Sequence, residues 1–144
     1  MERPNLILSS KNLRSGLRWL AAVFFILAGI NHFLHPAFYE KIMPPGFPAP
    51  KFLIFVSGLA EVAGGFGLLI HPLRRAAGWG LIALLVAVFP VNIYMALYPG
   101  HFEIAPWILW ARLPLQAIFV AWVWWISLAR SPASGVFLEN APGQ

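Results

Sequence analysis

The sequence contains no cysteine and no aspartate. Without a thiol, the chain forms no disulfide and supplies no thiolate to an iron–sulfur cluster or a haem. Without aspartate it has no Ser–His–Asp triad, and its glycines form neither a phosphate-binding loop nor a dinucleotide fingerprint. These absences exclude thiol redox chemistry and argue against the common hydrolase and nucleotide-binding classes.

Charged residues are also scarce: they make up 10% of the 144 residues, against 60% for hydrophobic residues, and mean hydropathy is +0.73. A water-soluble domain of this length could not bury that much apolar surface. The formal net charge of +5 has the sign that nucleic acids attract, but most basic residues flank apolar stretches and form no stripe. The composition therefore predicts a membrane protein whose partner is the lipid bilayer and not a nucleic acid.

Four apolar stretches are long enough to cross a hydrocarbon core of roughly 30 Å as helices that rise about 1.5 Å per residue. They cover residues 17–34, 52–70, 76–97 and 107–129. All seven tryptophans lie toward the ends of these stretches, where lipid head groups favour aromatic side chains. The sequence predicts an all-α, membrane-spanning four-helix bundle over residues 17–129, between a loose tail at 1–16 and a second polar tail at 130–144.

The distribution of lysine and arginine predicts the orientation. Seven of these residues lie on the side that holds the N-terminus, the 71–76 turn and the C-terminus, whereas only Lys41 and Lys51 lie on the opposite side. Because basic residues are enriched in cytoplasmic segments, both termini are predicted to lie in the cytoplasm (N-in, C-in), with the protein in a bacterial inner membrane.

A proline-rich connection joins the first two spans: residues 36–50 hold five prolines among apolar and aromatic side chains. Pro36 suits the first turn of a short helix, and the later prolines favour stiff, extended backbone. The segment is expected either to cover the end of the bundle or to be a plain connector with interfacial anchors.

One carboxylate, Glu61, lies at the middle of the second span, FLIFVSGLAEVAGGFGLLI, which carries no other charge. A charge at that depth costs on the order of 2.5–3.5 kcal/mol, so Glu61 needs a partner, a proton or water. Gly64 and Gly65 share its helix face, where missing side chains would let neighbouring backbones approach. The other helices are therefore predicted to pack around this span.

Polar side chains of all four spans fall at similar depth. Counted from the outer surface at about 1.5 Å per residue they lie roughly 5–14 Å deep, whereas the inner half holds almost none. They are Asn31, His32, Glu61, Asn92, Arg112 and Gln116. Since intramembrane ionisable groups usually mark functional sites, the pattern predicts a buried polar cluster that binds a ligand.

Glu61 and Arg112 are predicted to form an ion pair, because the long arginine side chain can close a depth difference of about 6 Å. Asn92, Gln116 and His32 would satisfy the remaining polar atoms of the pair. Two interpretations stay open: the cluster is a ligand pocket, or the pair only locks the bundle of a structural or interaction module.

Two prolines lie inside spans, Pro90 two residues before Asn92 and Pro114 two residues before Gln116. Each removes an amide donor and frees the carbonyl four residues earlier. The kinked helices would line the site, or the kinks would serve packing alone.

The histidines of the sequence could contribute to a metal site with only a few ligands. His32 and His35 with Glu61 would supply three ligands, fewer than the dense sets of bundle metal sites. No metal is therefore expected.

An ordered set of short segments runs through about residues 15–128. The segments are Ala28-Gly29-Ile30-Asn31-His32-Phe33, Pro36 and Phe38, Met43-Pro44-Pro45, Pro48-Ala49-Pro50, Ser57-Gly58-Leu59-Ala60-Glu61, Pro72 with Arg74-Arg75, Leu85-Val86-Ala87-Val88-Phe89-Pro90-Val91-Asn92, and Arg112-Leu113-Pro114-Leu115-Gln116. In this order they resemble the DoxX family of small bacterial membrane proteins, although no single segment is specific.

The resemblance implies a four-helix membrane bundle and a loose functional assignment. Some relatives are linked to quinone-coupled oxidation of sulfur compounds, as a small subunit of thiosulfate:quinone oxidoreductase, and others to redox-stress complexes. Relatives that handle disulfides are no guide, because this chain has no thiol. The expectation is an accessory subunit that binds a quinone or another hydrophobic small molecule, or that anchors a redox partner protein or a second copy, with no catalysis of its own.

Overall fold

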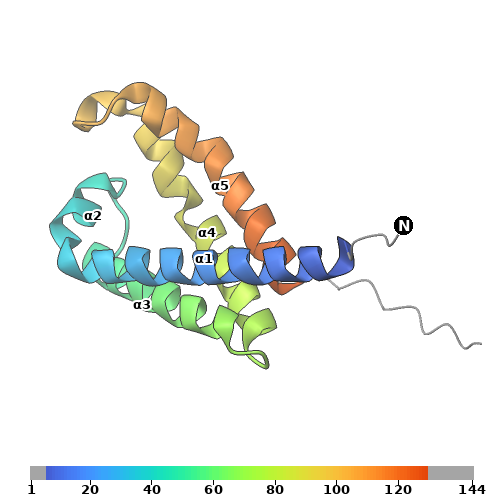
Figure 1. The fold of residues 1–144 in the computed structure, drawn as a ribbon. Helices are drawn as coiled ribbons and strands as arrows, with labels where there is room; N and C mark the ends of the chain where they lie inside the picture. Colours follow the sequence, from blue (N-terminus) through green and yellow to red (C-terminus); the bar gives the residue numbers. More distant parts are fainter. Residues whose placement is uncertain (1–5, 130–144) are drawn as a thin grey trace, which may run out of the picture.

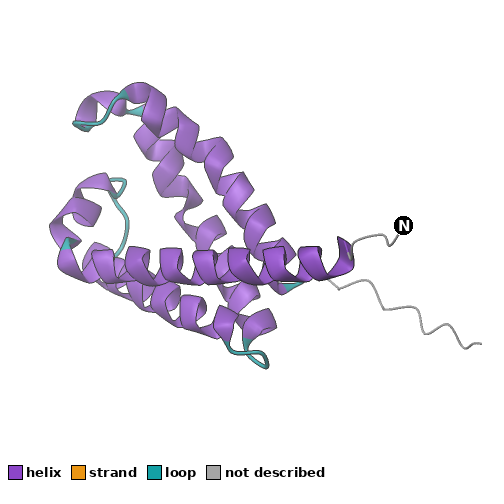
Figure 2. Cartoon of the chain, in the orientation of Figure 1, coloured by secondary structure: helices purple, strands orange, loops and turns teal. Residues whose placement is uncertain are grey.

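The computed structural model describes the backbone of residues 6–129 and the side chains from Asn12 onward. Within this range the chain forms five α-helices and one short 3-10 helix, and no strand (Figure 1, Figure 2). The elements are α1 (Leu6–Leu34), α2 (Pro36–Ile42), α3 (Pro50–Leu69), α4 (Arg74–Leu97), η1 (Pro99–His101) and α5 (Pro106–Ser127). The predicted all-α class is confirmed, while the predicted tail at 130–144 lies outside the described residues.

Four of these helices are long and apolar enough to cross a membrane. The qualifying segments are Asn12–Leu34, Pro50–Leu69, Arg74–Leu97 and Pro106–Ser127. Proline occupies the first turn of α2, α3 and α5, where its missing amide donor has no partner to lose. The four apolar helices predicted from the sequence are therefore confirmed, with shifts of a few residues at their ends.

The first helix is longer than predicted. The sequence predicts a loose tail up to residue 16, whereas α1 already begins at Leu6. No proline interrupts residues 6–34, and the single Gly16 costs only about 1 kcal/mol inside a helix, so the span extends without a break toward the N-terminus. The prediction of a loose tail is wrong for residues 6–16.

The long helices form two pairs, α1 with α3 and α4 with α5, and α3 also packs against α4 (Figure 1). α1 meets α5 where α1 begins and α5 ends. There Arg14 donates a 2.5 Å hydrogen bond to the Ala129 carbonyl, and Arg18 Nε donates one of 3.3 Å to the Ile126 carbonyl. We call this the basic end. From it the two pairs diverge toward the far end, which carries α2 and η1 (Figure 1).

The main hydrophobic core lies toward the basic end and takes residues from all four long helices. Its buried members are Ala21, Ala22, Phe25, Leu68, Leu81, Val123 and Ile126. On its far side the Phe24 and Phe119 rings stack with their centroids 4.8 Å apart. The helices are thus held together at the basic end, and the space between them widens beyond this core.

α1 approaches α3 closely because glycines face the contact. A Cβ atom built on Gly29 would lie 2.5 Å from the Gly58 carbonyl oxygen, and one built on Gly65 would lie 2.8 Å from that of Ala22. Gly64 gives the same room to α4. The predicted close approach of neighbouring helices to the Glu61 span is confirmed.

The proline-rich segment closes the far end. α2 begins at Pro36, as the sequence predicts, and residues 43–49 after it are not helical. Ile42 is buried with Met95 of α4 and Leu109 of α5 in a second, smaller core. The segment therefore acts as a cover and not as a plain connector.

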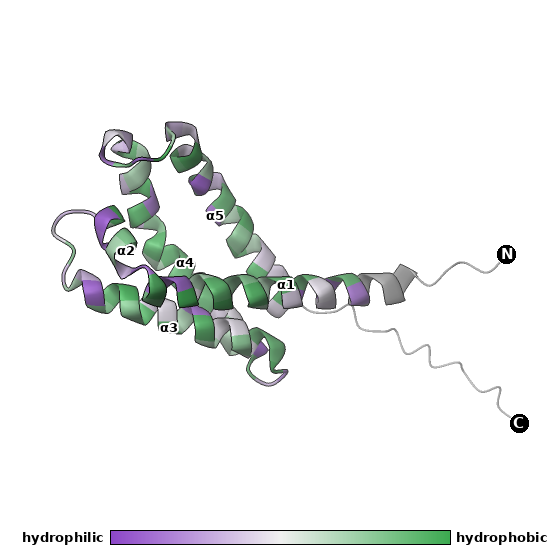
Figure 3. Cartoon of the chain, turned by 60° about the vertical axis from the view of Figure 1, so that its left-hand side comes forward, coloured by the Kyte–Doolittle hydropathy of each residue, from purple (hydrophilic) through white to green (hydrophobic). Residues whose placement is uncertain are grey.

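The four long helices carry mainly apolar residues (Figure 3). Large hydrophobic side chains stand out from several of them, among them Leu27, Phe52 and Trp107, which are 61, 64 and 72% exposed. Soluble monomers rarely expose apolar surface on this scale. This surface is compatible with a multi-pass membrane protein.

Candidate functional site

Two cavities lie between the core at the basic end and the cover at the far end, and they share five residues. One cavity, of about 360 Å³, extends between α1 and α5. The other, of about 200 Å³, extends between α3 and α4 toward the cover. The shared residues are His32, Tyr39, Glu61, Asn92 and Arg112. We call these five the polar waist, and the cavities the α1–α5 lobe and the α3–α4 lobe.

Beyond the polar waist, both lobes are walled mainly by apolar side chains. Phe24, Leu85 and Phe119 are among the walls of the α1–α5 lobe, which is partly open to the outside. Met43 and Phe47 of the cover help to wall the α3–α4 lobe. A polar band therefore lies between two apolar chambers.

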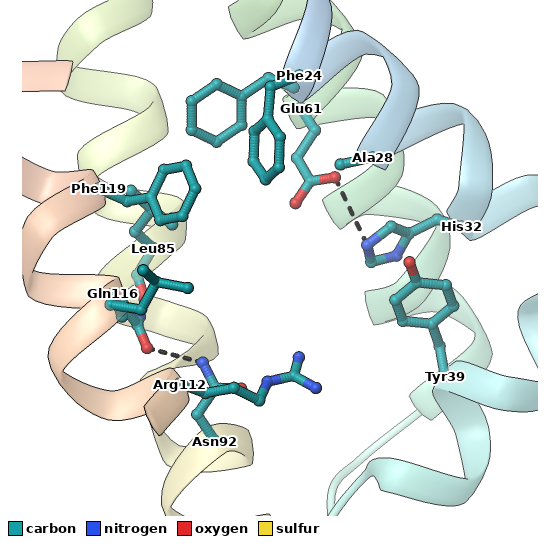
Figure 4. A pocket seen from close by; sticks show the side chains of 12 residues that line it. Phe24, Ala28, His32, Tyr39, Glu61, Leu85, Asn92, Arg112, Gln116 and Phe119 are labelled. Atoms are coloured by element: carbon teal, nitrogen blue, oxygen red, sulfur yellow. Dashed lines mark hydrogen bonds and ion pairs between the residues drawn. The ribbon is translucent and has the colours of Figure 1, made fainter. Parts of the chain in front are cut away.

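His32 is the nearest basic partner of Glu61. His32 Nε2 on α1 lies 3.5 Å from Glu61 Oε2 on α3 (Figure 4). The His32 and Glu61 side chains are only 11 and 16% exposed. Glu61 Oε2 accepts no hydrogen bond from any described residue, so this contact alone does not satisfy the carboxylate.

The predicted ion pair between Glu61 and Arg112 is absent. Among the side chains of residues 12–129, no acid–base pair closer than 4.0 Å is found except the contact between His32 and Glu61. Arg112 projects from α5, across the cavity from Glu61 (Figure 4). Helical rise predicts the depth of a residue but not its lateral position, and at this depth the two helix pairs have already diverged.

Arg112 accordingly lies at the cavity without a hydrogen-bond acceptor among the described residues. Its side chain is half-buried, and it lines both lobes together with Tyr39. A guanidinium carries five N–H donors, and burying it without an acceptor costs free energy. The polar waist therefore presents unused donors on the α5 wall and a carboxylate with an imidazole on the opposite wall.

The two amides bond to each other instead of serving an ion pair. Asn92 Nδ2 on α4 donates a 2.7 Å hydrogen bond to Gln116 Oε1 on α5, and Gln116 Nε2 donates to the Leu85 carbonyl. Gln116 is only 7% exposed. Leu85 directly precedes Val86, and the Val86 carbonyl lacks a helical donor because Pro90, four residues later, has no N–H. Gln116 thus ties α4 to α5 next to the proline.

Tyr39 belongs to the site, although the sequence analysis does not single it out. Its ring stacks on His32 with centroids 3.8 Å apart, and its hydroxyl accepts a 2.9 Å hydrogen bond from Asn31 Nδ2. Asn31 Oδ1 lies 2.9 Å from His35 Nδ1. Asn31 lines neither lobe, and it contributes to the site by its hydrogen bond to the Tyr39 hydroxyl. No helical spacing links α2 to the spans, so Tyr39 looks like an ordinary interfacial anchor in the sequence.

Pro90 and Pro114 lie inside α4 and α5, as predicted, but neither lines a lobe. Each precedes an inward-facing amide, Asn92 or Gln116, by two residues, which is about 200° around a helix. Their side chains are exposed on the other face. The helices that carry these prolines do line the lobes, and the role of the proline kinks in shaping the site stays a prediction.

The sequence places six polar residues at one level, and five of them line the lobes in the structure. They are His32, Glu61, Asn92, Arg112 and Gln116. Between Asn12 and Ala129, no three histidine or acidic side chains gather closely enough to hold a metal ion, and His35 turns to Asn31. The arrangement is suited to binding a molecule with polar oxygen atoms and an apolar body.

Residues 20–127 match the family described as a domain of unknown function, DUF8561. The chain belongs to the DUF8561 family. The matched range holds all five residues of the polar waist and runs from the first span to the last residue of α5. No curated protein and no solved structure matches the chain. The resemblance to the DoxX family stays a prediction.

Proposed function

We propose that this DUF8561 chain is an integral membrane protein that binds a lipid-soluble small molecule at the polar waist, with a quinone as the best-fitting class. The head group would occupy the waist, and the ring substituents and tail would extend into the lobes. The chain would serve a redox system as an accessory subunit, alone or as a homo-oligomer, and would hold the molecule for a redox partner protein.

The guanidinium of Arg112, which has no hydrogen-bond acceptor among the described residues, carries this proposal. A protein does not ordinarily place a half-buried cation at a cavity without an acceptor, because the desolvation of the charge is then uncompensated. A quinone carbonyl oxygen is such an acceptor. It is uncharged, so it can accept a hydrogen bond from the guanidinium without bringing a negative charge into the cavity. The cavity is within the size range of small-molecule sites, which begins at about 300 Å³.

The opposite wall supports a head group with a second oxygen. Glu61 and His32 lie across the cavity from Arg112, so a molecule with oxygens at two ends could meet both walls. The α1–α5 lobe is partly open to the outside, so a lipid-soluble molecule would have a way into it from the bilayer.

The positions of the arginines support the proposed orientation. Arg14, Arg18 and Arg74 each donate a hydrogen bond to a carbonyl in the last turn of α5 or α3 or just after it, at the same end of the molecule. By the positive-inside rule this end would face the cytoplasm of a bacterial inner membrane, with both termini on that side. The polar waist would then lie in the outer half.

The rival proposal is a structural or interaction module in which the polar residues only hold the helices together. In the form predicted from the sequence it depends on a Glu61–Arg112 pair, which the structure does not contain within 4.0 Å. The Asn92–Gln116 contact is the feature that favours it, because this contact does join two helices.

Calorimetric titration of the purified protein with a short-tail benzoquinone tests the proposal. The matched control ligand is the same alkyl tail on a benzene ring, which partitions into detergent but offers no carbonyl. Saturable binding of the quinone alone is expected, and Arg112→Gln should weaken it about tenfold or more while Arg75→Gln, on the exposed start of α4, should not. Equal behaviour of the two ligands, or of wild type and Arg112→Gln, would contradict the proposal.

A further inference from the structure

The two walls of the polar waist need opposite hydrogen-bonding partners. On the α5 wall, the Arg112 guanidinium offers only donors, and it has no acceptor among the described residues. On the α1–α3 wall, the ionised carboxylate of Glu61 offers only acceptors. A molecule that bridges the walls must therefore present an acceptor to one wall and a donor to the other.

The Glu61 carboxylate receives no hydrogen bond from the described residues. Oε2 is buried beside His32 and has no hydrogen-bond donor there, although His32 Nε2 lies 3.5 Å away. The other oxygen, Oε1, points into the cavity (Figure 4). A carboxylate oxygen that meets a ligand without receiving a donor loses its hydration uncompensated. Oε1 is therefore the atom at which a donor is needed.

The donors nearby are engaged or lie elsewhere. Asn92 Nδ2 donates to Gln116 Oε1 at 2.7 Å. The Tyr39 hydroxyl, which accepts a hydrogen bond from α1, forms none with Glu61 among the described contacts. Arg112 lies on the opposite wall, across the cavity (Figure 4). The donor that Glu61 lacks therefore has to come with the ligand.

We propose that the polar waist binds the reduced, hydroquinone form of its ligand in preference to the quinone form. A hydroquinone hydroxyl both donates and accepts, so one hydroxyl can donate to Glu61 Oε1 while the other accepts from Arg112. Both oxygens of a quinone are acceptors, so one carbonyl would face the carboxylate with no proton between them. The inference rests on the proposed function and names the redox form that the same site prefers.

Anaerobic calorimetric titration of the full chain with the oxidised and reduced forms of one short-tail benzoquinone tests this preference. The hydroquinone should bind about tenfold more tightly, because a hydrogen bond to a charged group replaces a contact between two acceptors. The dimethyl ether of the same hydroquinone keeps both oxygens but has no O–H, so it should lose the advantage. A quinone or an ether that binds as tightly as the hydroquinone would overturn the inference.

The redox potential of the bound ligand gives a second readout on the wild-type protein. Tighter binding of the reduced form raises the midpoint potential of a two-electron couple by about 30 mV for each factor of ten in affinity. Potentiometric titration in one detergent should therefore give a higher potential with the protein than without it. An unchanged or lowered potential of the saturably bound ligand would overturn the inference.

Glu61→Gln isolates the contribution of the carboxylate. The glutamine amide can donate to a quinone carbonyl, so the two redox forms should bind with about equal affinity. Glu103→Gln, at an exposed position after η1, is the matched control and should keep the preference. The full wild-type preference in Glu61→Gln would overturn the inference, and the wild-type titrations decide the matter if this variant does not fold. Saturable binding of neither form to wild type would instead contradict the proposed function, and the inference with it.

Discussion

His32 Nε2 lies 3.5 Å from Glu61 Oε2, so the buried carboxylate is paired with a residue of the neighbouring helix α1 and not with Arg112 of α5. This relationship separates the two halves of the polar waist. The α1–α3 wall carries a carboxylate and an imidazole in mutual contact, while the α5 wall carries a cation that has no acceptor among the described residues. We therefore expect a ligand to bridge the two walls.

Arg112→Gln should leave the stability of the empty protein unchanged or raise it slightly. The substitution removes a half-buried cation that has no carboxylate of the described residues within 4.0 Å, so no ion pair between described residues is broken. If Arg112 instead locked the bundle, its removal should cost about 3–5 kcal/mol because Glu61 would lose its partner. Thermal unfolding of the two proteins in the same detergent distinguishes the alternatives, and a large fall in Tm would support the lock.

Gln116→Leu should destabilise the protein by about 1–2 kcal/mol. The substitution leaves the Leu85 carbonyl and the Asn92 amide without their partner in the space between α4 and α5. Ala117→Leu, at the adjacent exposed position, is the matched control and should have little effect. Chemical unfolding in mixed micelles measures both, and equal stabilities would show that this amide contact contributes nothing.

Gly29→Ala should destabilise the contact of α1 with α3 by about 1–3 kcal/mol. The added methyl group would meet the Gly58 carbonyl oxygen at 2.5 Å, which forces the helices apart. Gly80→Ala, on α4, meets nothing within 4 Å and should be neutral or gain up to about 1 kcal/mol from helix propensity. Comparison of the two Tm values gives the result, and it would count against the close packing if Gly29→Ala were as stable as Gly80→Ala.

The absence of cysteine makes the proposed topology simple to test. His71→Cys places a thiol in the turn between α3 and α4, and Glu103→Cys places one in the connection between α4 and α5, both at exposed positions. With both termini in the cytoplasm, a membrane-impermeant maleimide should label only Glu103→Cys in cells whose outer membrane is permeabilised, and label both after lysis. The reverse labelling pattern would invert the orientation.

Much of the fold could be predicted because apolar length and helix punctuation are local properties of the sequence. The four spans follow from runs of apolar residues, and the starts of α2, α3 and α5 follow from Pro36, Pro50 and Pro106. The point at which α1 begins could not be predicted, because a single glycine such as Gly16 does not show whether a helix continues through it.

The site was predictable in depth but not in arrangement. Helical rise assigns His32, Glu61 and Arg112 to one level, and the structure does place them around common cavities. Which of them touch depends on the divergence of the two helix pairs, and this divergence results from packing at the basic end, far from the site. Tyr39 enters the site through the fold of the cover, for which no periodic pattern exists.

The central claim is that a bound molecule satisfies Arg112, and native mass spectrometry of protein extracted gently from its own membrane tests it most directly. Wild type and the surface control Arg75→Gln should carry one quinone or other lipid-soluble molecule per chain, and Arg112→Gln should lose it while remaining folded. A wild-type chain without such a molecule, or an equal amount retained by Arg112→Gln, would contradict the claim and leave the polar waist as a device for packing.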